Sequence, residues 1–248
     1  VGTWRNAILL KGTEEIALER QTKIKALVGD EKDPIKKAKI VYKYVQDKTR
    51  YISIQLGIGG WKPMLAKDVD RLGYGDCKAL TNYTKALLEV VNVPSYYTVI
   101  YGDSQRRNLD QDFVSMQGNH VILGLPIDNK MYWLECTSQK APFAFQGDFT
   151  DNRLALTIKP EGGEIVKTKE YVAQENTQIS KGNYAIDGDG NISGNILIKS
   201  KGMQYDNKYT YEGSSNDDLV KFYKKYFWNI SNLKIKKINM LNNKDDVE

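Results

Sequence analysis

Residues 72–94 read LGYGDCKALTNYTKALLEVVNVP, and this stretch decides how the chain folds. Two glycines interrupt the preceding structure, and a helix is then predicted to begin near Asp76. The buried face of that helix follows the three- and four-residue spacing of an amphipathic helix: Leu80, Tyr83, Leu87 and Val91. Pro94 closes the segment. The pattern therefore places Cys77 in the first turn of a buried helix.

A cysteine in this position has two interpretations. The positive end of the helix dipole and the free N–H groups stabilise a thiolate, which is the reactive form of the side chain. Gly75 lets another backbone or a substrate approach closely. The alternative is that Cys77 is a small buried apolar residue, as most lone cysteines are.

The composition is that of a globular chain with a substantial core. Hydrophobic residues make up 41% of the 248 positions and charged residues 27%, which excludes collagen-like, low-complexity and mostly disordered classes. No apolar run approaches the roughly 18–20 residues of a membrane-spanning helix, so we expect no integral membrane segment. The chain begins at Val1 with no visible secretory signal, and we expect processing or trimming upstream of it.

The formal charge of +5 is mild and scattered. The lysines of residues 30–48 alternate with apolar residues at helical spacing, which favours a solvated helix face. Residues 221–237 mix basic and aromatic side chains and are the best candidate for a nucleic-acid or membrane surface. An amphipathic helix followed by an edge strand is the favoured interpretation there, and no nucleic-acid partner is expected.

The counts of cysteine and histidine restrict the chemistry. The chain has two cysteines, Cys77 and Cys136, and a single histidine, His120. They cannot form a disulfide-rich scaffold or a zinc site with the usual four nitrogen and sulfur ligands, and no calcium loop pattern is present. We therefore expect no metal and no cofactor, and any imidazole chemistry must use His120.

A predicted hairpin brings an acid to this histidine. Residues 119–126 and 130–137 are predicted strands, and a turn centred on Asp128 and Asn129 would pair residue 127 with residue 130. His120 then lies diagonally across from Glu135 on one face. Cys136 points to the opposite face, which favours a core position and argues against a disulfide with Cys77. A one-residue shift of register would undo this argument.

The remaining pattern predicts an α+β domain over residues 1–172 and part of a second, β-containing module over residues 173–248. Other helices are predicted at 13–28 (Thr13 as N-cap), 33–48 and 214–228. Other strands are predicted at 51–55, 95–102, 153–160, 163–169 and 233–241, with a hairpin at 183–202 and a polar loop at 103–117.

The ordered motifs YGDCKALTNYTKALLEVVNVPSYYTVI, NHVIL and YWLECTS resemble the transglutaminase-like superfamily, and in particular its bacterial secreted or periplasmic branch. The resemblance covers about residues 33–150. It implies a core related to papain-like cysteine proteases, in which a nucleophile helix packs on an antiparallel sheet. It also implies that Cys77 is the nucleophile, His120 the base and Glu135 the orienting acid, where the family usually has Asp.

The resemblance further implies acyl transfer through a thioester on Cys77, acting on peptide or carboxamide bonds, with hydrolysis favoured over cross-linking. The oxyanion would be held by the Cys77 backbone N–H and by Trp61, or by Gln55 in analogy with papain-like enzymes. The implied partner is a protein or peptide substrate and the implied location is periplasmic or extracellular. Relatives often carry a β-rich domain ahead of this core, so we expect the chain to be part of a longer protein.

Two other functions stay open at this point. The chain could be a catalytically inactive binding or scaffold module that keeps the transglutaminase fold, because Glu replaces the usual Asp. Alternatively, residues 173–248 could carry a carbohydrate- or surface-binding activity, with which their alternating strands are compatible.

Overall fold

The computed structural model describes residues 1–245, and the chain divides into two compact units, Val1–Glu170 and Tyr171–Glu248. Both units combine helices with strands, which confirms the α+β class. No helix within the described residues is long and apolar enough to cross a membrane.

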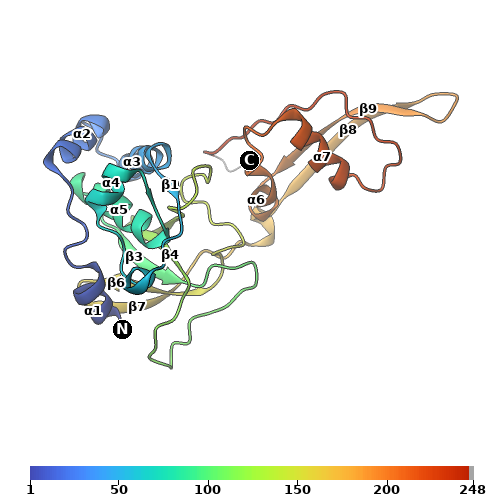
Figure 1. Cartoon of the computed structure of the whole chain (residues 1–248). Helices are drawn as coiled ribbons and strands as arrows, with labels where there is room; N and C mark the ends of the chain where they lie inside the picture. Colours follow the sequence, from blue (N-terminus) through green and yellow to red (C-terminus); the bar gives the residue numbers. More distant parts are fainter. Residues whose placement is uncertain (246–248) are drawn as a thin grey trace. The chain divides into compact units, whose positions relative to one another are not determined.

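A five-stranded antiparallel sheet organises the first unit, in the order β5-β4-β3-β6-β7 (Figure 1). Its strands are β3 (Tyr96–Ile100), β4 (His120–Ile127), β5 (Lys130–Leu134), β6 (Leu154–Lys159) and β7 (Gly162–Lys167). A separate parallel pair is formed by β1 (Arg50–Tyr51) and β2 (Tyr74–Gly75). The predicted strand 51–55 is thus wrong beyond its first residue, because residues 52–55 take no regular structure.

Helices gather around α5 (Cys77–Val90), which packs against β3 and β4. They are α2 (Leu18–Val28), α3 (Pro34–Lys48) and α4 (Ala66–Leu72). The short elements α1 (Gly2–Trp4) and η1 (Arg5–Leu10) lie against β6, and η2 (Gly57–Gly60) lies between β1 and α4. The start of α3 is as predicted. The carboxylate of Asp33 accepts from the backbone N–H groups of Ile35 and Lys36, and Pro34 occupies the first helical position.

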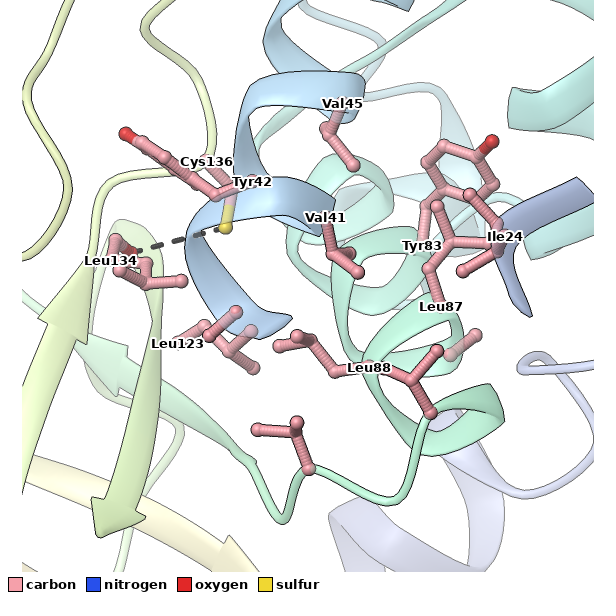
Figure 2. Packing of buried hydrophobic residues seen from close by; sticks show 14 of the residues in the cluster. Ile24, Val41, Tyr42, Val45, Tyr83, Leu87, Leu88, Leu123, Leu134 and Cys136 are labelled. Carbon is pink, nitrogen blue, oxygen red and sulfur yellow. Dashed lines mark hydrogen bonds between the residues drawn. The ribbon is translucent and has the colours of Figure 1, made fainter. Parts of the chain in front are cut away.

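The main core lies between these helices and the sheet, as Figure 2 shows. Its side chains include Ile24, Val41, Leu87, Leu88, Leu123 and Leu134, each fully buried. Burial of such a side chain contributes about 1.5–3 kcal/mol. Cys136 belongs to this cluster and both cysteines are free, which confirms the expected core position and the absence of a disulfide.

The helix predicted over 13–28 begins only at Leu18. Thr13 is buried, and its hydroxyl donates to the Leu10 carbonyl at 2.6 Å. Its own carbonyl accepts from the Ala66 backbone at 2.8 Å and from the Asn82 amide at 3.1 Å. Thr13 therefore does not cap a helix, because these long-range bonds tie it to α4 and α5.

The second unit contains η3 (Ala173–Glu175), the hairpin β8 (Gln178–Ile186) and β9 (Ile192–Ser200), and helices α6 (Met203–Tyr209) and α7 (Asn216–Tyr226). The predicted hairpin and the predicted helix, capped by Ser215, are confirmed. The predicted strand 233–241 is wrong. An alternating pattern becomes a strand only where another strand offers backbone partners, and residues 233–241 pair with none. Helix α6 was not predicted.

Candidate active site

Cys77 is the first residue of α5, which agrees with the predicted helix start near Asp76. Asp76 is the N-cap, and its carboxylate accepts from the Ala79 backbone N–H at 3.0 Å. The same carboxylate pairs with the Lys78 ammonium, and both side chains are buried. A Cβ added to Gly75 would lie 2.7 Å from the Ala79 Cβ, so only glycine fits this close approach. The cysteine is thus fixed at a rigid helix start.

The β4–β5 hairpin positions the histidine and the acid. Asp128 and Asn129 have positive φ angles of 50° and 58° and form the predicted two-residue turn. The register pairs Ile127 with Lys130, as predicted. His120 Nε2 and Glu135 Oε2 lie 2.8 Å apart, with Glu135 one residue beyond the end of β5.

These two groups form a buried ion pair that also involves the thiol. Burial alone would lower the pKa of His120, but the charge of Glu135 and hydrogen bonds to Cys77 and Glu135 raise that pKa to about 10. Burial would raise the pKa of Glu135, but His120 and Thr137 together lower it. Because Nε2 bonds the carboxylate, Nδ1 is the ring nitrogen that remains for an interaction with the thiol. The arrangement suits an imidazolium held between an acid and a thiol.

Further side chains hold the pair in place. Tyr42 of α3 donates to the Glu135 carbonyl at 2.7 Å. Thr137 donates to Glu135 Oε1 through its backbone N–H at 3.0 Å and also through its hydroxyl. The Phe149 ring meets the His120 ring edge-to-face at 5.1 Å between centroids. A register that pairs residue 127 with residue 130 also places Thr137 opposite His120. No local pattern indicates Tyr42 or Phe149, which lie far away in sequence.

A glycine and an asparagine fix the start of β4. The Asn119 side chain accepts from the Gly102 backbone N–H at 2.7 Å and donates to the Gly102 carbonyl at 3.2 Å. A Cβ on Gly102 would lie 2.9 Å from the His120 Cβ and 2.5 Å from a ring atom of Phe149. Gly102 is therefore the residue that leaves room for the imidazole.

The thiol and the imidazole are largely covered. Cys77 is 7% exposed and His120 8%. Cys77 belongs to a small apolar cluster with Leu10, Tyr97, Val99, Val121 and Ile158. A cavity of about 180 Å³ begins beside the same helix start and is lined by Asp76 and Ala79 together with residues of the 54–64 segment. The side chains of Cys77 and His120 are thus mostly shielded from solvent.

The two side chains predicted for the oxyanion make contacts with other residues. Trp61 is 42% exposed, and the guanidinium of Arg5 lies 5.9 Å from its ring centroid. The Gln55 amide donates to Ser53 Oγ at 3.2 Å. Within residues 1–245 neither side chain makes a hydrogen bond to Cys77, and no group of three His, Cys, Asp or Glu side chains gathers as metal ligands.

Comparison with known proteins finds two solved structures of low sequence identity. No family model and no curated protein matches the chain. It is similar to a solved "putative protease" from Parabacteroides distasonis, with 15% identity and a TM-score of 0.46 over 61% of this chain and 27% of that one. It is also similar to a "putative cysteine protease" from Cytophaga hutchinsonii, with 13% identity and a TM-score of 0.39 over 77% and 54%. The chain thus spans about a quarter of the length of the first protein and about half of the length of the second.

Proposed function

We propose that the protein is a cysteine-dependent hydrolase or acyltransferase of the transglutaminase-like type, acting on peptide or carboxamide bonds of a protein or peptide. One observation carries the proposal: the single imidazole is bonded to a carboxylate, with 2.8 Å between His120 Nε2 and Glu135 Oε2, and the thiol of Cys77, at a helix start, is near enough to raise the pKa of that imidazole. The proposed location, periplasmic or extracellular, rests on the resemblance stated above.

In the proposed reaction the Cys77 thiolate attacks the carbonyl carbon of the amide, and the C=O pair moves to oxygen. When the tetrahedral intermediate collapses, the C–N bond breaks and His120 gives its proton to the leaving amine. The product is a thioester on Cys77. His120 then takes a proton from water, or from an acceptor amine, which attacks the thioester and releases the thiolate. Glu135 keeps the ring oriented and offsets its charge.

The oxyanion needs donors aimed at the position where the negative charge develops. The backbone N–H of Cys77, at the N-terminus of α5, is one proposed donor. Trp61 and Gln55 stay proposals for the second donor, and each requires a movement of the segment between β1 and α4, since both now point to other partners.

Selective alkylation tests the proposal. Iodoacetamide is expected to modify Cys77 rapidly, and the rate should fall at least tenfold in His120→Ala. Cys136 is the internal control, because burial raises the pKa of its thiol to about 12 and makes it unreactive. Mass spectrometry of the Cys136→Ala variant assigns the adduct to Cys77. Equal rates with and without the imidazole would refute the activated thiol.

The burial of Cys77 favours a second function, a catalytically inactive module that keeps the fold for binding. In that case both thiols react slowly in the folded protein and only denaturant exposes them. The two functions therefore differ in one measurable rate, that of Cys77 in the native state relative to the unfolded state.

A further inference from the structure

Arg5 lies in the first unit with its charge buried, next to the Trp61 ring and without an anionic partner among the described residues. The residue is only 5% exposed, and its Nε is shielded from solvent without a hydrogen-bond partner. Its one recorded side-chain hydrogen bond, to the Gln117 carbonyl, is 3.3 Å long. A guanidinium has five N–H donors, and no carboxylate among the described residues forms an ion pair with this one. Burial lowers the pKa of Arg5, in keeping with the lack of an anionic partner.

This guanidinium lines a cavity of about 230 Å³, which offers room for a group of side-chain size. Apolar residues form much of the wall, among them Leu109, Phe113, Leu156 and Ile165. The one acid in the wall, Asp110, is exposed, and its carboxylate accepts from the Asp112 backbone N–H at 3.0 Å. The walls therefore supply a positive charge without a matching negative one.

An isolated buried charge costs several kcal/mol unless a partner offsets it. Proteins place a planar guanidinium in such a position where it can make two parallel hydrogen bonds to a carboxylate. A surface arginine needs no such partner, because water solvates it. The buried and unpaired state of Arg5 thus points to an anionic group from outside the chain.

The cavity lies next to the proposed active site. Burial raises the pKa of Tyr97 well above its usual value, and the nearby charge of Cys77 raises it further whereas that of Arg5 lowers it. Leu156, which lines the cavity, also packs against the apolar cluster that contains Cys77 and Tyr97. In addition, Gln117, the acceptor for Arg5, precedes His120 by only three residues.

We propose that Arg5 binds a carboxylate of the substrate, either an acidic side chain or a free C-terminus, in this cavity beside Cys77. The assignment to the substrate rests on the proposed function, but the carboxylate site itself does not. The apolar walls would accommodate the carbon chain that carries the carboxylate, and the guanidinium would fix its end. Arg5 is thus a specificity residue for acidic peptides.

Binding is tested on the Cys77→Ala chain, where no turnover can occur. The probes are two matched pairs of blocked dipeptides. Acetyl-Gly-Gly with a free carboxylate is compared with its amide, and acetyl-Glu-Gly amide with acetyl-Gln-Gly amide. At least one acid should bind about tenfold more tightly than its neutral partner, and it should shift the NMR signal of the Arg5 Nε–H. The acid that binds identifies the source of the carboxylate.

Variants locate the site. Arg5→Met keeps the apolar stem and should remove the preference for the acid, whereas the exposed Arg50→Met should keep it. Arg5→Lys keeps the positive charge and replaces Arg5→Met in the test if Arg5→Met does not fold. It should retain only part of the preference for the acidic peptide, because an ammonium cannot make two parallel hydrogen bonds to a carboxylate. Equal binding of acid and amide in the parent chain, or a preference that survives Arg5→Met, would overturn the proposal.

One further measurement links the site to the thiol. In the chain with Cys77 intact, the acidic peptide should slow the alkylation of Cys77 in the folded protein. It should have no effect on the alkylation of Cys77 in the denatured protein. Tight binding without protection would show that the carboxylate belongs to a ligand other than the substrate. Failure of the proposed catalysis alone would leave the peptide binding intact, so the two failures can be told apart.

Discussion

Replacing Glu135 with glutamine removes one negative charge and keeps the shape of the side chain. The charge now lies against His120, with 2.8 Å between Nε2 and Oε2, and the two side chains are only 9% and 16% exposed. The substitution is therefore expected to lower the pKa of the imidazole and to reduce any turnover that depends on the imidazolium.

The size of the effect follows from the geometry. With roughly 4 Å between the charge centres and an effective dielectric constant of about 20, the attraction is about 4 kcal/mol. At 1.36 kcal/mol per pKa unit this corresponds to a fall of about 3. The pKa of His120 is thus expected to fall from about 10 to roughly 7 in Glu135→Gln. Burial of the ring is unchanged in the variant and still disfavours the charged imidazole.

The assay is an NMR titration of the imidazole between about pH 4 and 11, and it is free of overlap because the chain has one histidine. Glu164→Gln, which removes an acid at an exposed position of β7, is the control and should leave the midpoint unchanged. A midpoint in Glu135→Gln within half a unit of the parent value would refute the ion pair and the role assigned to Glu135.

Three further predictions follow from the same site. The pKa of His120 is raised and that of Glu135 is lowered, so their contribution to the free energy of unfolding is complete between about pH 4.5 and 6.5. In denaturant titrations this contribution should fall as pH rises towards 10, by up to about 1.4 kcal/mol per pH unit, and it should also fall in acid. A free energy of unfolding that does not change with pH in these ranges would contradict the ion pair. Gly102→Ala should lower the free energy of unfolding by about 1–3 kcal/mol. It should also shift the NMR signals of His120 and Phe149, because the added methyl group would clash with both side chains. Unchanged signals would show that the site can accommodate a methyl group at this position. Tyr42→Phe should cost about 1–2 kcal/mol by leaving the Glu135 carbonyl without its donor, and thermal unfolding of the two proteins measures it, with an unchanged midpoint counting against the bond.

Local signals in the sequence determined the start of α5 and the hairpin that carries His120 and Glu135. Helix capping involves residues within four positions of one another, and a two-residue turn fixes the strand register beside it. For this reason the helix start near Asp76, with Cys77 in the first turn, could be predicted, and the face shared by the histidine and the acid could be predicted from the turn.

Only the tertiary structure decided what surrounds those residues. The bonds that stop Thr13 from capping a helix come from Ala66 and Asn82, and the partner of Arg5 is 112 residues away. The burial of Cys77 likewise depends on segments from both ends of the first unit. Such contacts join residues that are distant in the chain, and their free energy depends on the packing of the whole domain, which no local pattern of residues contains.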